Sequence, residues 1–317
     1  MLINTIEEFK DIIGGTPLNN NFANIAASVA DAKNFIIPFI GSEAYKAAEA
    51  IANGVAVEGI SPELQEQYLS AARKPIAWKA QYDYVPEGNV VFDDTGIHTQ
   101  KSNDGQTSAW QWQVYDLQQL YMKKAYNTLN ELLMFLDRNR DGLKFWKDSE
   151  AEKQRQKLFV RTPAEFGEFF DIKGSFALFL TIAPDMLSVQ RTTIKNALGK
   201  DVYHGLITKW VNKGEFSDSE GAIFNACKAV VAYYGLAKRI RTLPASLMPD
   251  GIVEYFHSDR TNIKASNNVR LEVLNQLYQQ LIADGDAAMV DLNELINADD
   301  DDRNGAFYTR SERAIGF

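Results

Sequence analysis

The sequence predicts a mainly α-helical protein of two homologous helical-bundle domains in tandem, each with a small β-hairpin arm. Apolar residues recur every three or four positions through long stretches, which is typical of packed helices. Short alternating segments beside glycine turns interrupt these stretches and indicate hairpins. Motifs of the first half also return in the second half in the same order. The chain therefore reads as an internal duplication.

The duplication rests on paired motifs whose separation drifts slowly along the chain, as loop insertions would make it. The pairs include Thr5-x-x-Glu8-Phe9 with Thr162-x-x-Glu165-Phe166, Ile40-Gly41-x-Glu43-x-Tyr45 with Leu198-Gly199-x-Asp201-x-Tyr203, Gly96-Ile97 with Gly251-Ile252, and Gln119-Leu120-Tyr121 with Gln276-Leu277-Tyr278. We assign residues 1–150 to the first helical repeat, residues 151–161 to a charged linker and residues 162–317 to the second helical repeat.

Each half is expected to begin with a capped helix. Thr5 with Glu8, and Thr162 with Glu165, have the spacing of a capping box. In this motif the hydroxyl and the carboxylate accept hydrogen bonds from otherwise unpaired backbone amides. A short amphipathic helix should follow each cap.

The next helices are expected to end at glycine. They should cover about residues 25–39 and 186–198, and they stop before Gly41 and Gly199. Glycine adopts positive φ without strain, so it commonly ends a helix. We predict positive φ at both positions.

Longer helices should complete each half. One begins at Ser61-Pro62 and runs to about Tyr84, and Pro75 is expected to kink or split it because proline lacks an amide donor. The longest helices should cover about residues 108–136 and 267–296, and Gly285 should weaken the second of these.

Two short segments are predicted to form hairpin arms, at residues 89–98 and 249–256, with polar surface loops after them. A lone two-stranded hairpin is marginal in water unless it packs on something, and its open edge can accept another strand. We expect the arms to be assembly surfaces, although each arm could instead fold back onto its own helices. Their apolar candidates are Val90, Phe92, Ile97, Ile252, Val253 and Phe256.

Two acidic segments begin like calcium-binding loops. Residues 137–142 and 300–305 both fit D-x-[DN]-x-[DN]-G, and Asp137, Asn139 and Asp141 would supply oxygen ligands in the first. The closing bidentate glutamate is replaced by Asp148 in the first segment and by Ser311 in the second. We therefore expect polar turns that end helices, and no strong calcium site.

Composition narrows the function classes. The net charge of −9 argues against nucleic acid as the main partner, because phosphate binding needs a basic surface. The cluster Lys238, Arg239 and Arg241 is expected to be a solvated face. No signal peptide or membrane-spanning run is recognised, so we expect a soluble protein of cytoplasmic synthesis with no membrane partner. The single cysteine, Cys227, should be buried.

Catalytic motifs are not found. The three histidines have no metal-ligand spacing, and no nucleophile elbow or glycine-rich phosphate loop occurs. We expect no enzyme activity, no catalytic residue and no cofactor. Three functions are considered, and an enzyme that uses Asp93 or His98 is the least supported of them. A binding or scaffolding module of unknown ligand, with calcium as a candidate, ranks second. The favoured function follows from the resemblance described next.

The order of motifs resembles the head–tail connector, or adaptor, proteins of tailed bacteriophages. It is closer still to an uncharacterised two-repeat family of phages and integrated elements of gut bacteria. The residues that carry the resemblance are Thr5, Glu8, Phe9, Gly41, Tyr45, Gly96, Leu120 and Tyr121, with their partners in the second half. The resemblance implies a ring-forming structural role at the head–tail junction of a virion, with other virion proteins or further copies of the chain as partners.

Overall fold

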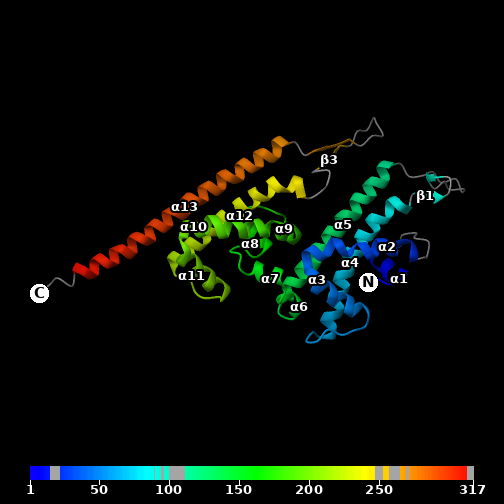
Figure 1. Ribbon diagram of the computed structural model, residues 1–317, viewed down its shortest axis with the longest axis horizontal. Helices are drawn as coiled ribbons and strands as arrows, with labels where there is room; N and C mark the ends of the chain where they lie inside the picture. Colours follow the sequence, from blue (N-terminus) through cyan, green and yellow to red (C-terminus); the bar gives the residue numbers. More distant parts are fainter. Residues whose placement is uncertain are drawn as a thin grey trace. The chain divides into compact units, whose positions relative to one another are not determined.

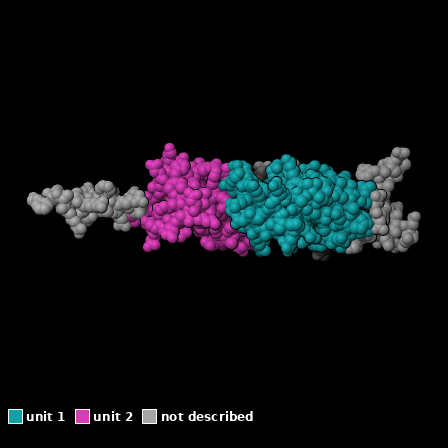
Figure 2. Space-filling model, turned by 90° about the horizontal axis from the view of Figure 1, so that it is seen from below, with its two compact units in different colours: residues 1–153, 257–264 teal, residues 154–256, 265–317 magenta. Residues whose placement is uncertain are grey.

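The computed structural model describes residues 1–14, 22–88, 90–93, 96–99, 111–246, 253–256, 265–268 and 271–312, and side chains outside 86–112, 242–271 and 299–312. The protein is mainly α-helical and forms two compact units (Figure 2). The first holds residues 1–153, and the second holds residues 154–256 and 265–317. Within the described residues, no helix is long and apolar enough to cross a membrane.

The first unit is built on a pair of long helices, and shorter helices pack against this pair (Figure 1). Helix α4 packs along α5, and α1, α2 and α3 also contact α4. In chain order its elements are α1 (Ile6–Ile13), α2 (Ala23–Asp31), α3 (Lys33–Ala52), α4 (Pro62–Gly88), β1 (Val90–Asp93), β2 (Gly96–Thr99), α5 (Gln111–Arg138) and α6 (Lys144–Lys147). Helix α7 (Glu150–Arg155) carries the chain into the second unit.

The second unit repeats this order with α12 packed along α13 (Figure 1). Its elements are α8 (Pro163–Gly167), α9 (Phe176–Val189), the π-helix η1 (Gln190–Ile194), α10 (Lys195–Leu198), α11 (Lys200–Val211), α12 (Asp218–Ser246), β3 (Val253–Phe256), β4 (Ala265–Asn268) and α13 (Leu271–Glu312). Both units thus place a hairpin between their two longest helices, and the mainly α, two-domain prediction is confirmed.

Both predicted helix starts form with the same geometry. The Thr5 hydroxyl accepts a hydrogen bond from the Glu8 amide at 3.2 Å, and Thr162 accepts one from Glu165 at 3.1 Å. Each glutamate then accepts from the backbone amide of the residue before the cap, at 2.8 Å and 2.6 Å respectively. These caps satisfy donors that a helix start otherwise leaves unpaired.

Gly41 and Gly199 make the same bend in the two units. Their φ and ψ are 81° and 161° for Gly41, and 74° and 164° for Gly199. This region is essentially restricted to glycine. The predicted positive φ is therefore confirmed at both positions. The following helix begins at once on the far side of each glycine, and it buries Tyr45 or Tyr203.

The helix expected before each glycine is interrupted in both units. In the first, α2 and α3 meet at Ala32. In the second, the equivalent position is Gln190, which starts the π-helix and is fully buried. Its side chain donates to the Lys157 carbonyl at 2.8 Å and accepts from the Phe159 amide at 2.9 Å. A buried amide needs such partners.

The expected linker is partly buried. The units divide between residues 153 and 154, inside α7, and the segment Leu158-Phe159-Val160 is at most 1% exposed. This segment comes directly before the Thr162 cap. In the first unit, the buried residues Leu2 and Ile3 come before the Thr5 cap in the same way. Residues 158–160 therefore belong to the core of the second unit.

Two helix expectations need correction. Helix α4 is not split at Pro75 but runs as one helix from Pro62 to Gly88, and its buried neighbours Ala72 and Ile76 show that the helix is held by packing on both sides of the proline. Tertiary packing supplies most helix stability in proteins, so it can outweigh one lost hydrogen bond. The acidic segment 300–305, expected to be a turn, lies inside α13, which continues past Gly305 to Glu312.

Candidate interaction site

The first hairpin places the three expected apolar residues on one face. Strands β1 and β2 are antiparallel, with Phe92 opposite Ile97 and Val90 opposite Thr99. Directly opposed residues share a face, and alternate residues of a strand share it too. Val90, Phe92 and Ile97 therefore lie on the same face of the hairpin, and Val91 with His98 lies on the other.

The second hairpin differs from the expected arm. Strand β3 pairs with β4, which was expected to be surface loop, and Val253 lies opposite Asn268. Phe256 falls on the opposite face from Val253 because the two are three residues apart. Ile252 lies outside the described residues. The second hairpin therefore does not gather the expected apolar set, and the first is the stronger candidate surface.

Both hairpins leave backbone edges open. Within the described strands each sheet consists of one antiparallel pair, so every strand has one unpaired edge. Such an edge is a template for pairing with another chain. The two hairpins also occupy equivalent places, between α4 and α5 and between α12 and α13.

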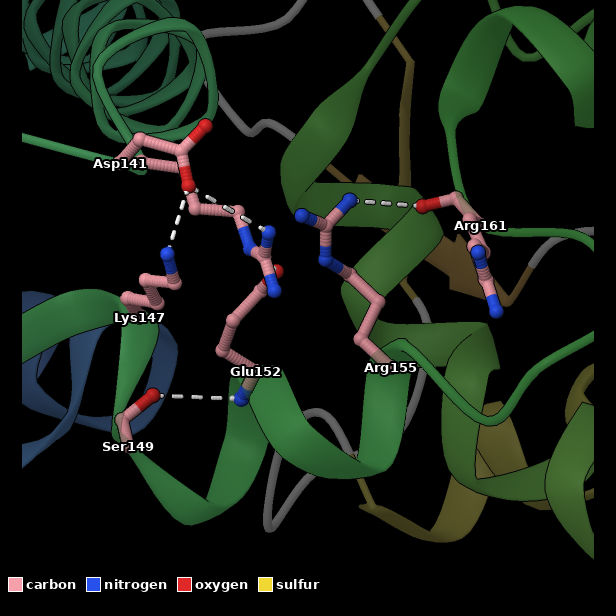
Figure 3. Close-up of polar contacts among 7 residues, drawn as sticks. Asp141, Lys147, Ser149, Glu152, Arg155 and Arg161 are labelled. Atoms are coloured by element: carbon pink, nitrogen blue, oxygen red, sulfur yellow. Dashed lines mark hydrogen bonds and ion pairs between the residues drawn. The ribbon is translucent and has the colours of Figure 1, made fainter. Parts of the chain in front are cut away.

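The candidate calcium ligands lie at the end of α5 and in the turn after it, and Figure 3 shows Asp141 of that turn. The Asn139 side-chain amide donates to the Phe135 carbonyl at 2.9 Å. Asp141 pairs with the Lys147 ammonium at 2.8 Å, and Asp137 also has a partner within the protein. In the part of the chain that is described, no group of three or more His, Cys, Asp or Glu side chains gathers where a metal could bind.

A neighbouring ion pair fixes this turn to the following helix. The Arg140 Nε donates to Glu152 Oε1 at 2.6 Å, and the Glu152 side chain is fully buried. The Ser149 hydroxyl accepts from the Glu152 amide at 3.2 Å and caps the start of α7 (Figure 3). Within the second unit, Arg155 donates to the Arg161 carbonyl at 2.7 Å. These contacts give the charged residues of the region structural roles.

The titratable groups whose pKa is clearly shifted are held by burial or by an ion pair. Burial raises the pKa of the Cys227 thiol to about 12, which makes it a poor nucleophile at neutral pH. The ammonium of Lys209 holds the pKa of Glu220 below its usual value. His204 is exposed, and the side chains of Asp93 and His98 lie outside those described. The pKa shifts of Cys227 and Glu220 therefore have structural causes.

Surface hollows differ in charge between the units. Two hollows of about 450 and 720 Å³ in the first unit are lined by side chains of both signs. A hollow of about 500 Å³ in the second unit is lined by Lys238, Arg241 and uncharged residues. Arg239, the third member of the basic cluster, pairs with Asp185 at 3.7 Å. Lys238 and Arg241 are exposed, as expected of a solvated face, whereas Arg239 is partly buried in this ion pair.

A family described as "Family of unknown function (DUF6712)" matches the chain twice, over residues 36–156 and 194–309. The chain belongs to this family. The two DUF6712 segments begin in α3 and in η1, and they cover most of both units, so the duplication predicted from paired motifs is confirmed. No curated protein and no solved structure matches the chain.

Proposed function

We propose that this chain is a non-enzymatic structural protein of a phage or prophage virion, and that it assembles at the head–tail junction. The observation that carries the proposal is the repeated hairpin between the two long helices of each unit. A two-stranded hairpin is marginal alone, and an open edge beside an apolar face is suited to a neighbouring chain. Val90, Phe92 and Ile97 would make that contact in the first unit.

The charge and chemistry of the chain also support an assembly role. A net charge of −9 disfavours direct binding to DNA phosphates, so the expected partners are proteins. The described groups with shifted pKa values serve packing and ion pairs, whereas an active site collects such groups in a cleft. Other virion proteins and further copies of this chain are the partners that we propose.

Deleting residues 89–99 tests the hairpin. We expect a folded helical protein, by circular dichroism, that no longer enters rings or particles, by electron microscopy and mass spectrometry of purified virions. A finer test replaces Phe92 by Ser, with Val91→Ser on the opposite face as the matched control. If both single variants assemble like wild type, or if the deletion unfolds the chain, the hairpin belongs to the core and the proposal for it fails.

The alternative is a binding or scaffolding module linked to calcium. The segment around Asp137, Asn139 and Asp141 motivates it, although Asn139 and Asp141 already contact other protein groups. We expect calorimetry to detect no tight calcium binding. Micromolar binding that disappears in Asp137→Ala would favour this alternative.

A further inference from the structure

The cationic hollow of the second unit combines charge with an aromatic wall. Lys238 Nζ donates to the Ser188 hydroxyl at 2.7 Å, and the Arg241 guanidinium lies 5.4 Å from the centre of the Tyr278 ring. Thr193 and Ile282 also line the hollow, and none of its lining residues is acidic. In a chain with more acidic than basic residues, this is a site for an anionic partner.

In the first unit, an aromatic side chain stands at the position that corresponds to Thr193. Counting back from the two bend glycines, Thr193 corresponds to Phe35. Phe35 packs against a cluster that contains Trp78 and Tyr121, whose rings stack at 5.7 Å. The second unit has thus exchanged a packed aromatic residue for a small hydroxyl residue.

The two units also differ in charge at a second position that lines the hollow. With the register of the paired motifs in α4 and α12, Lys238 corresponds to Asp83. Asp83 forms an ion pair with Lys79 at 2.5 Å in the first unit. This position therefore carries an aspartate in the first unit and a lysine that lines a hollow in the second.

The same chain carries an anionic segment, whose charge is opposite to that of the hollow. Asp299, Asp300, Asp301 and Asp302 are consecutive in α13. Adjacent like charges and the low helix propensity of aspartate both disfavour the helix there, so a cationic partner would stabilise it. Four consecutive positions of a helix also span about 300° around its axis.

The aspartate run cannot reach the hollow of its own chain. Tyr278 and Ile282, which line the hollow, and the run from Asp299 belong to one continuous helix. At 1.5 Å per residue, Ile282 and Asp299 are separated by about 25 Å along that helix. The two surfaces can therefore meet only between different molecules.

We propose that Asp299–Asp302 of one copy bind the hollow of Lys238 and Arg241 on a second copy. Such a contact joins two different surfaces of the same chain, and head-to-tail contacts of this kind generate rings or filaments. The inference rests on the proposed function in one respect, that the chain assembles with copies of itself. It names the charged contact, whereas the first hairpin accounts for the apolar one.

Sedimentation and native mass spectrometry of the purified full chain, over a concentration series, test the contact. We expect wild type to self-associate at low salt and to dissociate as salt screens the charges. Lys238→Glu/Arg241→Glu should weaken self-association at least about tenfold, because like charges then face each other. Lys195→Glu/Lys200→Glu makes the same change in net charge outside the hollow and should associate like wild type.

Three further variants separate the contact from misfolding. Asp300→Lys/Asp301→Lys should weaken association to a similar degree, and a chain that carries both pairs of swaps should regain it. Thr193→Phe should place a bulky ring in the hollow, and it should weaken association without changing any charge. Thermal unfolding of each variant checks that it remains folded.

Several results would overturn the inference. Wild type that stays monomeric at high concentration and low salt would do so, as would a Lys238→Glu/Arg241→Glu protein that associates normally. A monomer whose melting temperature is raised by inorganic phosphate, through Lys238 and Arg241, would make the hollow a small-anion site. The virion proposal is tested separately, since it fails only if the chain is absent from particles.

Discussion

Single residues decide how each unit bends and how its helices begin. The bend at Gly41 and Gly199 has a backbone conformation that other residues rarely adopt. A Cβ at either glycine would meet no atom within 4 Å. The requirement for glycine is therefore one of backbone conformation and not of space.

The first prediction concerns these bends. Gly41→Ala and Gly199→Ala should each lower the free energy of unfolding by about 1–3 kcal/mol, the cost of a strained backbone at such a position. Chemical denaturation measures the change. Gly205→Ala is the matched control, because Gly205 is an exposed residue inside α11 with no atom within 4 Å of the added Cβ. It should raise stability by about 0.5–1 kcal/mol. Equal effects at all three sites would contradict the explanation.

Equivalent cations also act through different partners in the two units. Arg73 donates to the Leu2 carbonyl at 2.7 Å and pairs with Glu8 at 2.5 Å. Its counterpart Lys228 lies over the Trp210 ring at 5.2 Å. Arg73 is thus held at the start of the first unit by a hydrogen bond and an ion pair, whereas Lys228 makes a cation–π contact with Trp210 of α11.

At the scale of elements, the long helix pair of the second unit depends on one close approach. Gly285 lies in the middle of α13, where a glycine normally weakens a helix. A Cβ at this position would overlap the ring of Tyr234 on α12. The Tyr234 hydroxyl also donates to Asp286 at 2.5 Å. The glycine is therefore explained by packing between α12 and α13.

The second prediction follows from this packing. Gly285→Ala should destabilise the protein by about 1–3 kcal/mol, because overpacking shifts side chains or backbone. Helix propensity alone predicts the opposite sign, a gain of about 1 kcal/mol. The same substitution in a Tyr234→Ala background should show that gain, since the ring is gone. Urea unfolding of the four proteins in this cycle gives the answer, and a stabilising Gly285→Ala in the wild-type background would refute the packing argument.

At the scale of the whole molecule, tyrosines in both units tie stability to alkaline pH. Burial raises the pKa of Tyr45, Tyr121 and Tyr203, and it raises that of Tyr68 strongly. Burial and the neighbouring Asp286 raise the pKa of Tyr234 from 10.0 to about 12. The native state therefore holds these protons more tightly than the unfolded chain does.

The third prediction is a loss of stability above pH 10. A group whose folded pKa is raised contributes stability that is complete below its unfolded pKa and is lost as pH rises through its folded pKa. For Tyr234 that window is pH 10 to about 12. Melting temperatures should fall across it, and Tyr68→Phe should make the fall shallower while costing about 1 kcal/mol near neutral pH through the lost 2.6 Å hydrogen bond to the Ala44 carbonyl. A melting temperature that is flat from pH 10 to 12 would rule this out.

The sequence by itself determined the features that depend on neighbours along the chain. The capping boxes at Thr5 and Thr162 and the bends at Gly41 and Gly199 are encoded within a few residues, so their repetition predicts two similar units. The first hairpin is equally local, because alternation around a tight turn fixes both its position and its register.

Tertiary structure alone decided the features that depend on residues far apart. Pro75 stays inside α4 because packed neighbours outweigh a local breaker, and Gly285 is needed because Tyr234 approaches it from another helix. The partner strand Ala265–Asn268 has a polar sequence that does not itself indicate a strand. The hollow at Lys238 depends on what the chain places opposite it, the small Thr193 and the ring of Tyr278. Local patterns report backbone preference, whereas a site depends on side chains that only folding brings together.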